Sequence, residues 1–321
     1  KTLMKRRSKS RRRTRGLASV VLWLNIGAFF LLGGWYVLQP PERKTEVARL
    51  VQNAFARDKQ VSPLDVVWDV WQLYYASGNS VSVEVAGERT FILGGMPRTT
   101  SFPHGTVRLL VNRGYIVGFS ETLQTPVWAA YRIEDLDRVR PAPPRPDRFE
   151  VDRRTLARVT PDMYSNTQYD RGHLAPNLAI ATRFGEEAQR ETFLMSNIVP
   201  QRHELNAGLW RELESRIATS YPARYHEVWV VCGPVFGNRP QRLPRGVAIP
   251  ESFYMIIVDE TEGRLRTLAY LFPQAIPSGA RVADYGTSID QIELLTGLDF
   301  FSELEDTAED ALEAMKTGRP W

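Results

Sequence analysis

The sequence predicts an α+β domain. Strand-like runs of β-branched and aromatic residues are grouped along the chain, and segments of helical periodicity are grouped apart from them. Aromatic residues make up 11% of the 321 residues and 21 prolines are present, which argues against a disordered chain and a simple helical bundle. The single cysteine, Cys232, excludes an intramolecular disulfide and a multi-cysteine zinc site.

The first element is a basic tail, residues 1–16. Its first 15 residues carry nine basic side chains and no acidic one. Without these nine, 32 basic face 37 acidic side chains, so the formal charge of +4 becomes −5. The basic character of the chain therefore belongs to the tail and not to the folded body.

Residues 17–38 contain no charged side chain, and a helix of these 22 residues would be about 33 Å long, enough to cross a bilayer core. Trp35 and Tyr36 stand near its end, where amphipathic rings favour the membrane interface. We expect a transmembrane anchor whose basic tail stays in the cytoplasm. A cleaved signal peptide, a mitochondrial presequence and a buried soluble helix are the alternatives.

Residues 39–98 are expected to form a membrane-proximal linker with helical parts. Val66, Val67, Val70, Trp71 and Tyr74 recur at helical spacing, which predicts a helix packed on the main domain. Strands are expected at these runs: 81–85, 90–93, 107–111, 115–119 and 127–133.

The second half begins after residues 138–148, a Pro/Arg-rich stretch that predicts an extended loop. Helices are expected at 186–193, 202–219, 289–295 and 304–315, and strands at 227–231, 253–258 and 265–271. Residues 306–321 form an acidic C-terminal helical segment. The arginines of residues 138–158 are either a basic face for a phosphate backbone or a solvated loop.

The strongest motif is the run from Tyr169 to Pro176, YDRGHLAP. Its histidine, His173, is the side-chain type best suited to general base catalysis near neutral pH. Arg171 carries a planar guanidinium that binds two phosphate oxygens at once. Together they suit attack on a phosphodiester, although a single histidine is also often structural.

A second group follows the run SNIVPQ at 196–201. Asn206, Trp210 and Glu214 are spaced at i, i+4 and i+8, which predicts one face of a helix. Asn206 and Glu214 both offer oxygen, the ligand type that magnesium prefers. In isolation, the asparagine could equally be a helix cap and the glutamate a solvent-facing charge.

These motifs resemble the DNA/RNA non-specific endonucleases of the ββα-metal (His-Me finger) class. The resemblance rests on DRGHLAP at 170–176, SNIVPQ at 196–201 and NAGLWRELE at 206–214, with weaker likenesses across residues 99–305. It implies a nuclease domain over that range, with a central antiparallel sheet, flanking helices and a ββα finger.

The resemblance implies a role for each motif residue. His173 looks like the general base that activates water. Asn206 resembles the direct ligand of Mg²⁺, or of Mn²⁺ or another divalent cation, and Glu214 resembles a residue that holds metal-bound water. Arg171 would contact the phosphate.

The two other motif positions are Asn197 and Asp170. Asn197 would orient His173 or the substrate. Asp170 would support the turn, the metal waters or the substrate contact.

We therefore expect a membrane-anchored nuclease acting on DNA, RNA or both, with a dimer as the first guess for its assembly. The expected location is a bacterial inner membrane with the nuclease domain in the periplasm. The alternative is a mitochondrial inner membrane with the domain facing the intermembrane space. A catalytically silent nucleic-acid-binding protein and a membrane scaffold that keeps the nuclease fold are the rival functions.

Overall fold

The computed structural model describes residues 23, 27–28, 31–55, 62–74, 81–82, 91–100, 105–136, 141–261, 263–318 and 320–321. The chain divides into two units, residues 1–52 and 53–321. In the first unit, residues 31–37 are helical and α2 (Pro41–Phe55) starts after Pro40. The basic tail and half of residues 17–38 lie outside the described residues. Within the described part, no helix is both long and apolar enough to cross a membrane.

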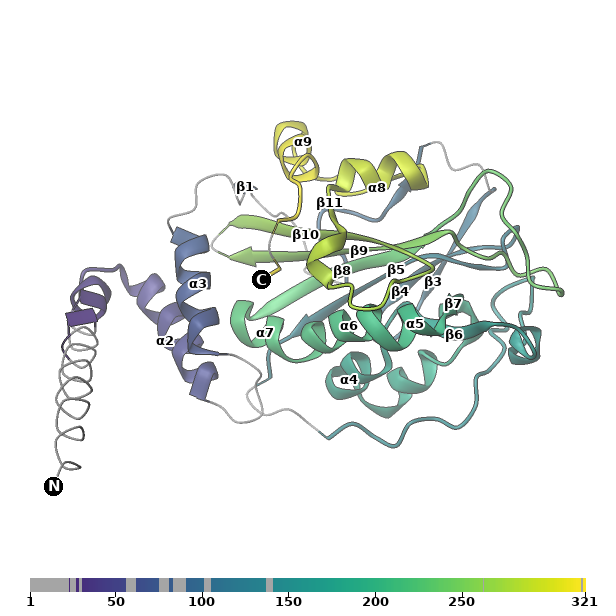
Figure 1. Cartoon of the computed structure of the whole chain (residues 1–321), viewed down its shortest axis with the longest axis horizontal. Helices are drawn as coiled ribbons and strands as arrows, with labels where there is room; N and C mark the ends of the chain where they lie inside the picture. Colours follow the sequence, from purple (N-terminus) through teal and green to yellow (C-terminus); the bar gives the residue numbers. More distant parts are fainter. Residues whose placement is uncertain are drawn as a thin grey trace, which may run out of the picture. The chain divides into compact units, whose positions relative to one another are not determined.

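An antiparallel sheet organises the second unit. Over the described residues it has eight strands in the order β1-β10-β9-β8-β5-β4-β3, with β11 paired to β10 (Figure 1). The strands are β1 (Val81–Ser82), β3 (Val107–Val111), β4 (Ile116–Ser120), β5 (Thr125–Glu134), β8 (Glu227–Val235), β9 (Ser252–Thr261), β10 (Arg264–Pro273) and β11 (Gly286–Thr287). The predicted antiparallel sheet is confirmed. The expected strand at 90–93 is wrong, because residues 91–93 form no strand.

Both faces of this sheet are buried, as alternate residues of β9 show. Met255 and Ile257 pack in one core, whereas Tyr254 and Ile256 pack in another. The first core is covered by α4 (Asn177–Glu191), α6 (Arg211–Ala218) and α7 (Ser220–Tyr225), and the second by α8 (Ile289–Thr296) and α9 (Asp306–Glu313) (Figure 1). Helices therefore lie on both faces of the sheet.

The helix α3 (Pro63–Tyr74) confirms the helix expected from Val66 to Tyr74. Its contact with the domain is charged: Asp69, fully buried, accepts hydrogen bonds from Arg224 Nε at 2.7 Å and from the Tyr225 hydroxyl at 2.6 Å. Part of the expected apolar stripe faces solvent, since Trp71 is 55% exposed. An ion pair at the centre of the interface thus attaches α3.

Candidate active site

A small antiparallel sheet carries the histidine motif. It pairs β6 (Tyr169–His173) with β7 (Ile198–Arg202), and α4 lies between them in the sequence. A Cβ added at Gly172 would lie 2.3 Å from Oε1 of the buried Gln201, so the close approach of the strands requires glycine there. His173 follows this glycine and is the last residue of β6.

The helical part of the finger follows β7 directly. It comprises α5 (His203–Leu205), a π-helical turn (Asn206–Trp210) and α6. The predicted regular helix over 202–219 is therefore wrong at its start: Gly208 has φ −103° and ψ −115° and interrupts it. Asn206 and Glu214 still line the same cleft, which has a volume of about 760 Å³.

The expected residues meet at this cleft. His173, Arg171, Asn206 and Glu214 all line it, and Arg145, Arg211, Arg216 and Glu212 line it as well. Of the six predicted site residues, Asp170 adjoins the cleft through Asn206, and Asn197 lies beneath it in the core.

The His173 ring packs between two aromatic side chains. Its centroid lies 5.5 Å from that of Phe149 and 5.0 Å from that of Phe193. Its Nε2 is buried and has no hydrogen-bond partner among the described residues. Burial, and secondarily the positive charge of Arg145, lowers the pKa of His173 to about 3. The imidazole is therefore neutral at pH 7, the form that a proton acceptor must have, but the same burial makes it a weak base.

Asp170 holds two residues of the helical part. Its Oδ2 accepts a hydrogen bond from Asn206 Nδ2 at 2.9 Å and lies 2.8 Å from His203 Nδ1. The bond to Asp170 fixes the amide of Asn206 through its nitrogen. The amide oxygen is left as the atom that can serve as a ligand.

Trp210 joins the two sides of the finger. Its indole nitrogen donates to the His173 carbonyl at 3.2 Å and to Glu214 Oε1 at 3.1 Å. Burial raises the pKa of Glu214 to about 8, against the lowering effects of the Trp210 bond and the charges of Arg145 and Arg211. At neutral pH the carboxyl therefore favours its protonated form, and a cation bound beside it would favour the charged form.

Arg171 is held from behind by a loop. Its Nε and Nη2 donate to the Pro161 carbonyl at 3.0 and 2.6 Å, and Nη2 lies 3.4 Å from Ser165 Oγ. The guanidinium carbon lies 5.8 Å from the centre of the Phe149 ring. These contacts orient the guanidinium at the cleft wall.

Asn197 is fully buried, and among the described residues its side chain bonds only to backbone groups. Its Oδ1 accepts from Ala175 N at 2.9 Å, and its Nδ2 donates to the carbonyls of Ala175 and Thr192, both at 3.0 Å. The asparagine therefore braces the chain that follows His173. Of the two expected roles, this position favours orienting His173 over contacting the substrate.

Sequence reasoning did not single out Arg145 and Arg211 as site residues. Arg145 lies in the predicted extended loop, and its guanidinium carbon is 5.0 Å from the centre of the Phe193 ring. The Pro/Arg-rich composition of that loop pointed to it, but several arginines share the loop. Their positions in the fold show which of them reaches the cleft.

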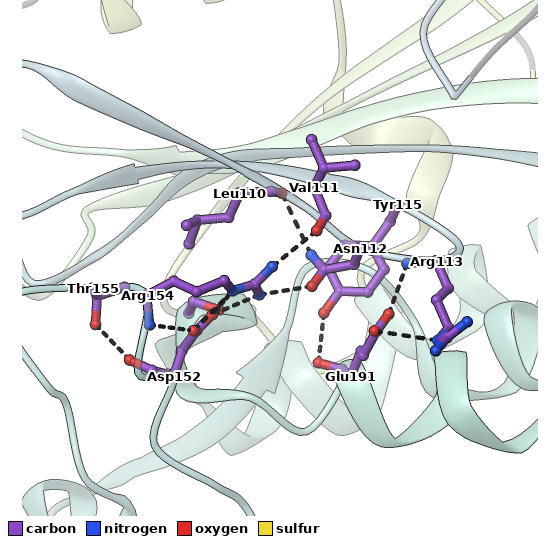
Figure 2. Close-up of polar contacts among 10 residues, drawn as sticks. Leu110, Val111, Asn112, Arg113, Tyr115, Asp152, Arg154, Thr155 and Glu191 are labelled. Carbon is purple, nitrogen blue, oxygen red and sulfur yellow. Dashed lines mark hydrogen bonds and ion pairs between the residues drawn. The ribbon is translucent and has the colours of Figure 1, made fainter.

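Arg154 shows the difference (Figure 2). Its Nη2 donates to Asp152 Oδ2 at 2.7 Å and to Asn112 Oδ1 at 2.8 Å, and Nη1 donates to the Val111 carbonyl at 2.8 Å. Although burial raises the pKa of Asp152, hydrogen bonds from Arg154 and Ser196 lower it overall. This arginine therefore ties the loop to the β3–β4 turn, and neither of the two alternatives for the arginines of residues 138–158 describes it.

The structure thus brings together at one cleft a histidine on a two-stranded antiparallel sheet, an asparagine on the helical segment that follows it, and several arginines. The sequence profile of the DNA/RNA non-specific endonuclease family matches residues 98–307, and the chain belongs to this family.

Several curated relatives carry the same domain. A nuclease of Nostoc sp. is 30% identical over 220 residues, which cover 64% of this chain and 77% of that protein. The mitochondrial nuclease EXOG of Xenopus laevis is 28% identical over 210 residues, which cover 60% of this chain and 57% of EXOG. The crystal structure of an EndoG/EndoGI complex aligns with a TM-score of 0.55 at 23% identity, over 64% of this chain and 90% of that chain, and supports the fold.

Proposed function

We propose that this nuclease is a magnesium-dependent endonuclease that cleaves phosphodiester bonds of DNA, RNA or both with little sequence preference. One observation carries the proposal: His173 and Asn206 come from the two halves of the finger and line one cleft. A proton acceptor and a cation ligand are the two groups that attack on a phosphodiester needs.

In the proposed reaction, His173 takes a proton from the water that attacks phosphorus. Its ring is neutral before substrate binds, and the negative phosphate then favours the protonated form. Arg171, Arg145 and Arg211 bind the phosphate oxygens from the cleft wall. The hydrogen bonds of Asn197 keep the His173 segment in place.

The residues of the cleft fit a hard divalent cation. Asn206 presents an amide oxygen because Asp170 holds its nitrogen, and Glu214 adds a carboxylate on the next turns of the helix. Oxygen donors, few protein ligands and an open cleft suit Mg²⁺, which keeps several waters. When bound, the cation would stabilise the negative charge of the phosphate and of the leaving oxygen.

We also propose that residues 17–38 anchor the enzyme in a membrane, with the nuclease unit on the far side from the basic tail. The support is the uncharged run of 22 residues behind nine basic side chains. A bacterial inner membrane with a periplasmic nuclease unit is the proposed location. Resistance to extraction by salt and carbonate tests the anchor, because a peripheral protein would be released.

Nicking of supercoiled plasmid tests the activity directly. The full chain should nick DNA in Mg²⁺, EDTA should stop the reaction, and His173→Ala should remove it. Cleavage that persists in EDTA would contradict the metal requirement. DNA binding without cleavage by the wild-type chain would favour a silent binding protein.

A further inference from the structure

Three carboxylates converge between α8 and α9. Asp290 and Glu293 come from α8, and Glu313 is the last residue of α9. One oxygen from each lies within 4.8 Å of the others. Asp290 is exposed, Glu293 is half-buried and Glu313 is buried, so the cluster runs from the surface inward.

Glu313 is an independent sign that the cluster holds a ligand. The residue is 6% exposed, and its Oε1 is buried without a hydrogen-bond donor among the described residues, although its carboxyl shares a hydrogen bond with that of Glu293. A carboxylate removed from water costs several kcal/mol unless a proton or a cation compensates it.

The surroundings supply further negative charge. The negative charge of Asp299 acts on Glu293 and that of Glu309 acts on Glu313, while the positive charge of Arg98 acts on Glu309 in the opposite direction. Within the described residues, no lysine, arginine or histidine forms an ion pair with the three carboxylates. The backbone N–H of Phe300 donates to Glu293 at 2.7 Å and holds that side chain in place.

We propose that Asp290, Glu293 and Glu313 bind a divalent cation, Ca²⁺ in preference to Mg²⁺. All three ligands are oxygen, which selects a hard cation. Calcium accepts irregular carboxylate geometry and completes its shell with water, for which exposed Asp290 leaves one side open.

The site is separate from the cleft and does not depend on the proposed nuclease mechanism. The helices α8 and α9 pack in the core on one face of the sheet, whereas α4 and α6 pack in the core on the other (Figure 1). A cation there joins the end of α9 to the start of α8. Its effect is therefore on stability.

A competing explanation is a proton shared between Glu293 and Glu313. Burial, together with the neighbouring acids, raises the pKa of Glu313 to about 9 and that of Glu293 to about 7. A shared proton would satisfy the pair without any cation, so the experiment must separate these two cases.

Calcium titration of the full chain decides between them. Calorimetry and thermal melting are performed at pH 7.5 on Asn206→Ala, which lacks the proposed ligand in the cleft. We expect one saturable site, and a melting temperature raised by about 5 °C at a hundredfold excess of Ca²⁺ over Kd. Adding Glu313→Gln should abolish both effects, and adding Asp290→Asn should weaken binding about tenfold.

Asp310→Asn is the matched control, since Asp310 is an exposed acid of α9 outside the three. It should leave binding and the temperature shift unchanged. No saturable binding by Asn206→Ala, or undiminished binding after Glu313→Gln, would overturn the proposal in favour of the shared proton. If Glu313→Gln does not fold, Asp290→Asn carries the test, and unchanged affinity there would likewise overturn it.

Discussion

Asp170 and Asn206 are joined by a hydrogen bond of 2.9 Å that crosses from strand β6 to the π-helical turn. Because the amide nitrogen is the donor, the amide oxygen of Asn206 is the atom left for a cation. In the proposed mechanism, the carboxylate would therefore act on metal binding through the asparagine, since Asp170 is not among the residues that line the cleft.

Asp170→Ala should raise the Mg²⁺ concentration for half-maximal activity by about 10- to 100-fold, since residues that orient a ligand have effects of this size. Titration of plasmid nicking with Mg²⁺ measures it. His203→Ala is the control because it removes the other partner of Asp170 and leaves the bond to Asn206. An unchanged Mg²⁺ requirement in Asp170→Ala would show that the hydrogen bond does not orient the ligand.

His173→Ala should lower kcat by about 10² to 10⁴ while the fold and DNA affinity are retained. The substitution removes the imidazole that takes up the proton in the proposed reaction, whereas the arginines of the cleft remain. Initial rates on supercoiled plasmid and a filter-binding assay in Ca²⁺ provide the two measurements. A loss of less than tenfold would assign the base to another group.

The pH dependence should report Glu214 and not the free histidine. His173, with its pKa lowered to about 3, is already neutral above pH 4, whereas Glu214, with its pKa raised to about 8, gains its charge as the pH rises toward 8. At low Mg²⁺ the activity should therefore increase up to about pH 8.

Higher Mg²⁺ should move this increase to lower pH, because the cation competes with the proton for the carboxylate. Glu214→Gln should remove the dependence along with much of the activity. A rise in activity that stays at the same pH at every Mg²⁺ concentration would exclude Glu214 as its source.

Asp69→Ala should destabilise the protein by about 3–5 kcal/mol, because it removes one half of a buried ion pair, the carboxylate to which the guanidinium of Arg224 donates. Urea unfolding measures the change. Glu186→Ala, which breaks the exposed pair with Arg190, should change stability by about 0.5 kcal/mol or less. Equal effects of the two substitutions would mean that α3 contributes little to the folded unit.

The sequence predicted the parts of the site that lie close together along the chain. His173 and Arg171 belong to one short motif and Asn206 to another, and the three meet at one cleft because β6 pairs with β7 and the helical segment follows β7 directly. Arg145 comes from a distant loop with other arginines, so only packing against Phe193 identifies it.

The sequence pattern also did not predict the local backbone conformation and contacts of the site. The π-helical turn begins at Asn206 because Gly208 adopts a non-helical conformation, which a glycine permits but does not require. The three hydrogen bonds of Asn197 likewise depend on where Ala175 and Thr192 lie after folding. The sheet was easier to predict, since its strands carry long apolar runs.

The attachment of α3 shows that the region homologous to the family and the folded nuclease unit begin at different residues. Homology to the family starts at residue 98, yet Asp69 neutralises a guanidinium inside the nuclease unit. A fragment cut at the homology boundary would contain every proposed catalytic group but would lack the carboxylate that pairs with Arg224. The stability of the nuclease unit is therefore expected to depend on residues upstream of the region that matches the family.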